Sequence, residues 1–327
     1  MANRDILNLC WSPDSSELFV STNGHGTWIY RPKDMDNTPK RFDEDVEAMT
    51  FSTDSRHLFF TTIDGDLHIW GTQPYRPILR VPLPGEGKWL KLFASPDPNH
   101  VLVWRGAYNL DNILNTTKIW LYHVLTGELL FSPDHDEVIH PILNADGRKL
   151  FYMDFTSTEY IWDIATGSQI AKWESNWLHN IPEQSVLECR WHEEQIVGYF
   201  SRYDWEKHQR VYRTALWNST TDEEQLFDFD DLTTLFESFK WAPDKIRVDT
   251  EIEHDADDDV FEVIHVQIWN PDRKRIRHFY VEFDKDEYPP LALSPDGMVL
   301  ASASTQPACI VLNDVLTGGF RIIKLEI

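Results

Sequence analysis

Two short stretches of this 327-residue chain concentrate side chains that could bind a metal ion or transfer a proton. The first, His192-Glu193-Glu194, begins like the zinc-binding phrase of helical metalloproteases, which needs a second histidine one helical turn later. That histidine is absent, and the neighbouring residues predict a hairpin turn, where two ligands would not share a helix face. We therefore interpret the segment as a turn.

The second stretch is the acidic run His254-Asp255-Ala256-Asp257-Asp258-Asp259. It lacks the central glycine and the distal glutamate of a helix-loop-helix calcium site, which indicates a solvated loop. The chain also contains no phosphate-binding loop, no nucleophile elbow and no closely spaced cysteine pair. The sequence therefore predicts no catalytic residue, no metal ion and no cofactor.

Charge and composition narrow the class of protein. There are 54 acidic and 30 basic residues, a formal net charge of −24. Such a surface repels nucleic acid and anionic membranes and attracts basic partners, although solubility alone would also explain it. The cysteines Cys10, Cys189 and Cys309 lie far apart, and no apolar run approaches the ~20 residues of a membrane helix. We expect a soluble cytoplasmic protein without a disulfide framework.

Two phrases alternate along the whole chain. One is a short apolar run, a turn rich in Pro, Asp, Ser or Gly, and an alternating strand, as in CWSPDSSELFVS and LALSPDGMVLAS. The other is an apolar run ending in Trp, a polar turn and a second alternating run, as in YIWDIATGSQI. The first phrase recurs every 40 to 52 residues, with its turns near Asp14, Asp54, Asp97, Asp146, Glu193, Asp244 and Asp296.

That period, with four strands per unit, is typical of propeller blades. The sequence predicts an all-β fold, a seven-bladed β-propeller with four antiparallel strands per blade, forming a single domain over residues 1–327. The expected blades are approximately 5–43, 45–83, 87–132, 137–174, 185–229, 235–283 and 289–327. Blade seven is expected to close the ring by packing against blade one without sharing a sheet.

The units resemble the WD-repeat β-propeller family over essentially the whole chain. The resemblance rests on SPDG at 294–297, IWDIATG at 161–167, and the LTG turns at 125–127 and 316–318. The Gly-His pair of a standard repeat is missing from nearly all blades, and only Trp162-Asp163 keeps the full dipeptide. The family's buried Asp-His-Ser-Trp network is therefore not implied. Similar divergent propellers form the C-terminal part of fungal NLR-like signalling ATPases, so a larger multidomain parent chain is also implied.

A series of tryptophans occupies the third strand of successive units: Trp28, Trp70, Trp120, Trp162, Trp217 and Trp269. A stacking platform for bases or sugars would also use indoles. Packing between neighbouring blades explains their shared register, so we predict a structural role for all six.

The resemblance implies that loops between second and third strands, and loops between blades, share a top face. The residues predicted to bind a partner there are Asp43, Glu44, Asp45, Tyr108, Leu110, Asp134, Asp136, Arg202, Tyr203, Trp205, Asp230, Asp231, Asp257, Asp258, Asp259, Asp284 and Asp286. Two longer central loops, 106–116 and 202–209, supply the apolar, aromatic and arginine members of this set. Basic residues such as Arg31, Arg56 and Arg148 fall on the opposite, bottom loops.

These features favour a non-catalytic interaction or sensing module that recognises a basic protein or peptide through its acidic top face. Nucleic acid and membrane partners are not expected. Two alternatives remain open: a hydrolase or metal-binding propeller that uses top-face carboxylates near the central channel, and a carbohydrate-binding propeller. Fold alone does not decide among them.

Overall fold

The computed structural model describes residues 6–22, 25–32, 39–42, 44–62, 64–84, 90–106, 117–133, 138–144, 146–154, 158–174, 185–192, 195–204, 209–218, 223–229, 247–254, 261–269, 275–284, 290–305 and 308–324. These residues form only strands and short turns, as the high content of aromatic and β-branched residues predicts. Across these ranges, no helix has the length and apolar character needed to cross a bilayer.

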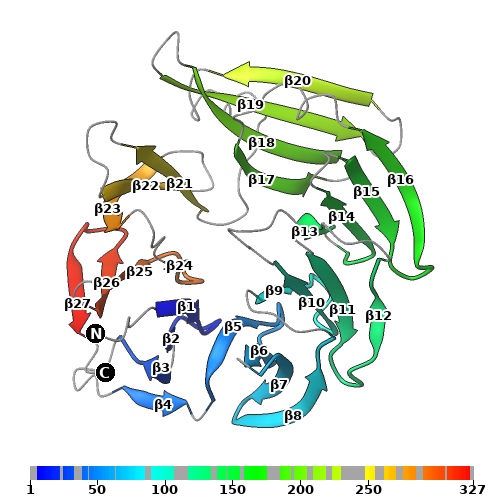
Figure 1. Cartoon of the computed structure of the whole chain (residues 1–327). Coiled ribbons are helices and arrows are strands. Elements are labelled where there is room, and N and C mark those ends of the chain that lie inside the picture. Colours follow the sequence, from blue (N-terminus) through cyan, green and yellow to red (C-terminus); the bar gives the residue numbers. More distant parts are fainter. Residues whose placement is uncertain are drawn as a thin grey trace. The chain divides into compact units, whose positions relative to one another are not determined.

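The strands form antiparallel meanders that follow the chain order (Figure 1). The first sheet contains β1 (Ile6–Trp11), β2 (Leu18–Thr22), β3 (Gly26–Tyr30) and β4 (Lys40–Phe42). The second contains β5 (Val46–Phe51), β6 (His57–Thr62), β7 (Asp66–Thr72) and β8 (Tyr75–Pro82). The third contains β9 (Leu90–Ala94), β10 (His100–Arg105), β11 (Lys118–His123) and β12 (Leu129–Phe131).

The remaining sheets continue the pattern. The fourth contains β13 (Ile139–Leu143), β14 (Lys149–Met153), β15 (Thr158–Asp163) and β16 (Ser168–Glu174). The fifth contains β17 (Ser185–His192), β18 (Gln195–Asp204), β19 (Gln209–Asn218) and β20 (Glu223–Phe229). A three-stranded sheet follows, with β21 (Arg247–His254), β22 (Phe261–Trp269) and β23 (Arg275–Asp284). The last contains β24 (Leu291–Leu293), β25 (Val299–Thr305), β26 (Ala308–Asp314) and β27 (Phe320–Lys324).

This all-β set of four-stranded antiparallel sheets fits a β-propeller. The chain divides into two compact units, one formed by Met1–Phe51, Leu58–His68 and Trp241–Ile327, the other by Ser52–His57 and Ile69–Lys240. The connections between the strands of each four-stranded meander lie at two opposite ends of the sheet. We call the end that holds the β1–β2 and β3–β4 turns, and their equivalents, the turn end. The opposite end, which holds the connection between second and third strands, is the loop end.

In the first unit, the first and last sheets pack against each other through a shared apolar cluster. Its buried members are Ile6, Leu9, Trp11, Leu18, Val20, Tyr30, Ala301, Ala303, Ile310, Leu312 and Ile323, with Trp28 packed against it. The Trp11 indole N–H donates to the Ala292 carbonyl at 3.0 Å, so a hydrogen bond joins the two sheets in addition to the apolar packing. The strands of the two sheets remain in separate sheets.

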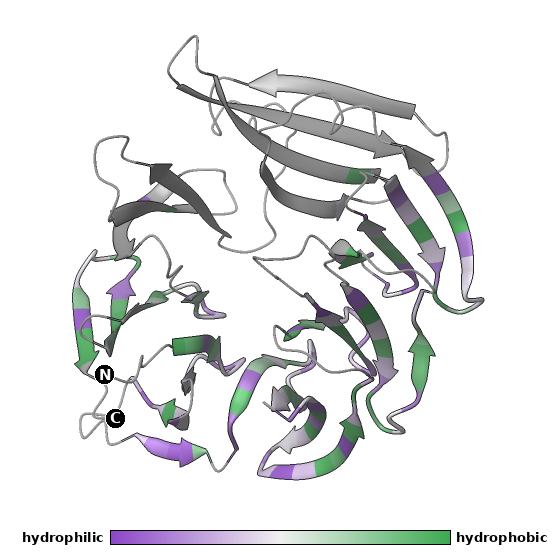
Figure 2. Cartoon of the chain, in the orientation of Figure 1, coloured by the Kyte–Doolittle hydropathy of each residue, from purple (hydrophilic) through white to green (hydrophobic). Residues whose placement is uncertain are grey.

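In the second unit, the third and fourth sheets share a second cluster. It contains Leu102, Ile119, Leu121, Phe131, Val138, Leu150, Tyr152 and Tyr160, with Trp104 and Trp162 packed against it. Figure 2 shows the hydrophobic residues on β10 and β11, whereas β4 is mostly hydrophilic. The Trp104 indole donates to the Val138 carbonyl at 2.8 Å, and the Trp191 indole donates to the Ile142 carbonyl at 3.4 Å.

The hairpin turns at the turn end share one hydrogen-bond pattern. The hydroxyls of Ser12, Ser52 and Ser294 donate to the aspartate two residues later at 2.6 to 2.7 Å. The same hydroxyls accept the backbone N–H of the residue five positions later at 2.8 to 2.9 Å. In the β13–β14 turn, the Asn144 side chain takes the serine's acceptor role toward Lys149 N at 2.8 Å. The recurring Ser-x-Asp phrase therefore closes each turn from within.

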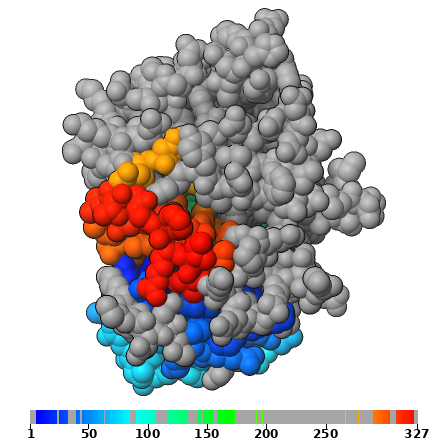
Figure 3. All heavy atoms as spheres, turned by 90° about the vertical axis from the view of Figure 1, so that its left-hand side faces the viewer, coloured from blue at the N-terminus to red at the C-terminus, as the bar shows by residue number. Residues whose placement is uncertain are grey.

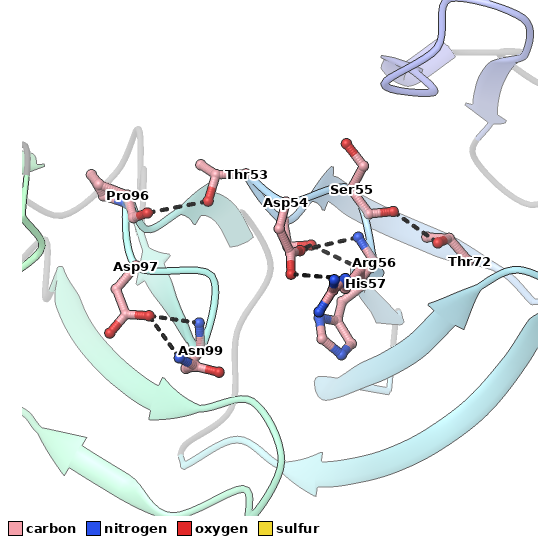
Figure 4. A network of polar contacts seen from close by, with 10 residues as sticks. Thr53, Asp54, Ser55, Arg56, His57, Thr72, Pro96, Asp97 and Asn99 are labelled. Carbon is pink, nitrogen blue, oxygen red and sulfur yellow. Dashed lines mark hydrogen bonds and ion pairs between the residues drawn. The ribbon is translucent and has the colours of Figure 1, made fainter.

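Neighbouring hairpin turns also touch one another within each unit. The Thr53 hydroxyl donates to the carbonyls of Ser95 and Pro96 at 3.2 and 3.3 Å, joining the second sheet's turn to the third sheet's (Figure 4). In the other unit, Asp296 N donates to Ser15 Oγ at 3.0 Å. Ser15 and Ser55 adopt positive φ angles of 58° and 65°, where the equivalent residues of two other turns are Gly147 and Gly297.

Candidate interaction surface

The described part of the predicted top-face set lies at or near the loop ends. Glu44 and Asp45 directly precede β5, with Glu44 half-buried and Asp45 exposed. Twelve predicted residues lie outside the described residues: Asp43, Tyr108, Leu110, Asp134, Asp136, Trp205, Asp230, Asp231, Asp257, Asp258, Asp259 and Asp286. Of the predicted structural tryptophans, Trp120 is only 4% exposed, and Trp28, Trp70 and Trp162 are half-buried. Trp217 and Trp269 belong to β19 and β22.

Three predicted loop residues belong to strands instead. Arg202 and Tyr203 are in β18 and pair with Val211 and Arg210 of β19. The segment 199–203, Tyr-Phe-Ser-Arg-Tyr, contains three aromatic residues, which favour a strand, and β18 continues past the point where the sequence analysis placed a loop. Asp284 is the last residue of β23 and pairs with Phe261. The prediction of loop positions was wrong for these residues, because long hairpins carry their pairing beyond the apolar run.

At the loop end of the first sheet, opposite charges lie close together. Gly26 has a φ of +84°, and a Cβ placed on it would lie 3.4 Å from Arg41 Nε and 3.5 Å from Asp45 Oδ1. The Thr22 hydroxyl, at the end of β2, donates to the Gly26 carbonyl, at the start of β3, at 2.8 Å. Arg41 therefore offsets part of the negative charge that Asp45 contributes to this edge.

The loop end of the fourth sheet contains a carboxylate with a structural role. Asp154, 8% exposed, accepts the Thr158 backbone N–H at 2.9 Å and the Tyr160 hydroxyl at 3.0 Å. Tyr152 stacks on Tyr160 with ring centroids 5.1 Å apart and accepts the Trp162 indole N–H at 2.9 Å. Burial raises the pKa of Tyr152 above its ordinary value, so its hydroxyl stays protonated. This network ties Asp154, at the end of β14, to Thr158 and Tyr160 of β15.

The loop end of the third sheet places a cation in the interior. Arg105 is 7% exposed, its Nη1 donates to the Pro84 carbonyl, and its guanidinium lies 5.1 Å from the Trp120 ring centroid. Burial raises the pKa of Tyr122 to about 12, and the positive charge of Arg105 opposes this shift. Sequence reasoning missed Arg105, because nothing in the phrase HVLVWRG separates a buried cation at a strand end from an exposed one.

The carboxylates of the turn end are engaged by their own turns. Hydrogen bonds from the Ser12 and Ser16 hydroxyls hold the pKa of Asp14 below its ordinary value. The backbone N–H and hydroxyl of Thr166 lower the pKa of Asp163 in the same way. Arg31 pairs with Glu17 at 2.8 Å, and Arg56 lies 3.8 Å from Asp54 (Figure 4). These carboxylates are thus engaged in hydrogen bonds or ion pairs with other residues of the turn end.

Exposed apolar side chains gather near the last strand. Leu316, Phe320 and Ile322 are all more than half exposed, and Figure 3 shows β27 at the surface of the molecule. Arg277 donates to the carbonyls of Val315 and Leu316 beside them. Across the described ranges, no group of three His, Cys, Asp or Glu side chains is arranged to hold a metal ion. Cys10 and Cys309 are free thiols.

Comparison with known proteins identifies the fold but no family. No protein-family model matches the chain, and no curated protein sequence matches it either. The structure is similar to Kuenenia stuttgartiensis hydrazine synthase, with a TM-score of 0.57 and 13% identity, over 100% of this chain and 97% of that chain. At this identity the likeness concerns the fold alone.

Proposed function

We propose that the chain is a WD-repeat-like, seven-bladed propeller that acts as a non-catalytic interaction module and binds a basic protein or peptide through the acidic residues of its loop ends. In this proposal each sheet is one blade, and the first strand of the three-stranded sheet falls in residues 230–246, outside the described residues. Two observations support this arrangement: each sheet is built from strands that are consecutive in the sequence, and the hairpin phrase recurs every 40 to 52 residues.

The observation that supports the function best is the different use of carboxylates at the two ends of the sheets. At the turn end, aspartates such as Asp14 and Asp54 accept hydrogen bonds from their own turns. At the loop end, Glu44 and Asp64 make no hydrogen bond or ion pair among the described residues, and Asp64 is exposed. Carboxylates that the fold does not use are available to attract a cationic partner.

The remaining acidic residues predicted for this surface follow the same topology. Residues 255–260 join β21 to β22 at the loop end of their sheet, and residues 230 and 231 directly follow the loop end of β20. They contribute Asp230, Asp231, Asp257, Asp258 and Asp259. We infer that these segments supply five of the twelve acidic residues predicted for the binding surface.

The test requires a partner captured from the source organism and a measured association rate. Replacing Asp257, Asp258 and Asp259 together by asparagine is expected to slow association, and wild-type association is expected to slow as salt rises, since screening acts over ~8 Å at physiological ionic strength. The matched control reverses Arg273, Lys274 and Arg275, which follow β22 at the turn end. Loss of binding in the control variant, or association insensitive to salt, would overturn the proposal.

A further inference from the structure

Three turns between third and fourth strands share a backbone shape but not a capping residue. Their sequences are HVLTG at 123–127, DIATG at 163–167 and DVLTG at 314–318. Each ends in a glycine with positive φ, 68°, 63° and 73° respectively. In the first and third, the glycine N–H donates to the carbonyl of the first residue at 2.9 Å. The turns therefore allow a comparison in which mainly the first side chain differs.

The first residue caps the turn through its side chain. The carboxylates of Asp163 and Asp314 accept the N–H of the threonine three positions later, at 2.8 and 2.7 Å. In the β11–β12 turn the imidazole Nδ1 of His123 takes this place, 3.3 Å from Thr126 N and 3.1 Å from Thr126 Oγ1. A ring nitrogen can accept a hydrogen bond only while it carries no proton.

The titratable and charged groups near His123 lie on β10, on the turn before β10 and on the β11–β12 turn itself. His123 pairs with His100 of β10, with ring centroids 5.9 Å apart, and His100 Nδ1 lies 3.4 Å from Asp97 Oδ2. Burial lowers the pKa of His100, Asp97 opposes that shift, and His123 adds to it. Glu128 on the turn itself is exposed, and its N–H bonds to Thr126 Oγ1 at 3.3 Å.

On its other side the turn meets apolar residues of β8. A Cβ placed on Gly127 would lie 2.7 Å from Leu79 Cδ2 and 2.9 Å from Val81 Cγ2, so the turn backbone packs tightly against this strand. Neither leucine nor valine titrates. Loss of the hydrogen bond between Thr126 N and His123 Nδ1 would therefore disturb the packing of the β11–β12 turn against β8.

We propose that the β11–β12 turn is a pH-sensitive element, in which protonation of His123 removes the acceptor of the Thr126 amide and loosens the turn against β8. Histidine ordinarily takes up its proton between about pH 8 and pH 5. The hydrogen bond from the Thr126 amide can form while the His123 ring is neutral at Nδ1 and cannot form once that nitrogen is protonated. The aspartate-capped turns keep their acceptors over the same range, because carboxylates protonate only near pH 4.

Amide hydrogen exchange of the whole chain, corrected for the intrinsic pH dependence of exchange, tests this directly. Between about pH 7.5 and about pH 5.5, protection of the Thr126 amide is expected to fall roughly fivefold, as for one lost hydrogen bond. The amides of Thr166 and Thr317 serve as controls in the same sample and should keep their protection. Unchanged protection at Thr126, or an equal fall at all three threonines, would overturn the proposal.

Three variants separate this role from a general structural one. His123→Asn retains a side-chain acceptor that does not titrate, so the fivefold change should disappear. Asp163→His should transfer the pH response to Thr166. His100→Asn should leave the response at Thr126 in place. If removing His100 abolishes the response while His123→Asn preserves it, His100 rather than His123 is the sensor, and the proposal is wrong.

Discussion

At the turn end of the sheets an aspartate recurs at one position of successive hairpins, and a serine hydroxyl and a backbone N–H both donate to its Oδ1. At the loop end the described charged residues share neither position nor partner. Asp64 is exposed, Asp154 is buried, and Arg105 is a buried cation. The turn end thus repeats one solution that closes a hairpin, while the loop end differs from sheet to sheet, as expected of a surface that can acquire binding specificity.

One loop-end carboxylate is an exception to this difference between the two ends, and replacing it is expected to have the largest effect on stability. Asp154 lies at the loop end yet serves the fold, because Thr158 N and the Tyr160 hydroxyl both donate to it. Asp154→Ala removes an acceptor used by two buried donors and should lower the free energy of unfolding by about 2 to 3 kcal/mol, as measured by urea denaturation. Asp64→Asn, at an exposed position, is the matched control and should change stability by less than ~0.5 kcal/mol.

The second prediction breaks a turn at the other end. Ser12→Ala removes the hydroxyl that donates to Asp14 and accepts Glu17 N, and should lower the free energy of unfolding by about 1 to 2 kcal/mol in thermal or chemical melts. Since the bond from the Ser12 hydroxyl lowers the pKa of Asp14, the contribution of this bond is full above the unfolded-state pKa, about 4, and is lost as the pH falls through the folded value. A variant whose stability loss persisted unchanged in strong acid would contradict this account.

The smallest expected effect concerns the two serines at positive φ. Ser55→Gly should raise the free energy of unfolding by about 0.5 kcal/mol, because glycine avoids the left-handed strain but loses more backbone entropy on folding. Ser15→Gly relieves the same strain but also removes the acceptor of Asp296 N. Its melting temperature should therefore stay at or below that of wild type. Equal gains in both variants would show that the Ser15 hydroxyl contributes nothing across the contact between sheets.

The architecture was accessible from the sequence because it depends on short-range patterns. Each Ser-x-Asp hairpin and each Asp-x-x-Thr-Gly turn is closed by residues within five positions of one another, so local phrases predict the strands on both sides. The same rule explains the errors at Arg202, Tyr203 and Asp284, since a hairpin's length depends on cross-strand pairing rather than on a local phrase.

Contacts between sheets were less accessible. The acceptors of the Trp11 and Trp191 indoles are backbone carbonyls, which leave no trace in side-chain identity. Likewise, the phrase HVLTG differs from DVLTG by one letter, and only the geometry shows that His123 takes over the aspartate's acceptor role. For the predicted binding surface, the sheet topology assigns the connection between β21 and β22, which contains Asp257, Asp258 and Asp259, to the loop end.

The contact between the first and last sheets has a consequence for synthesis in the cell. The bonds from Trp11 to Ala292 and from Asp296 to Ser15 each join residues 281 positions apart. At ribosomal rates of about 5 to 20 residues per second, Trp11 waits on the order of half a minute before its acceptor has been made. During that interval the apolar face formed by Trp11, Leu18 and Val20 is without the last sheet that covers it. Apolar surface of the first sheet is therefore exposed to aggregation during synthesis, and its packing is completed only after the last sheet has been made.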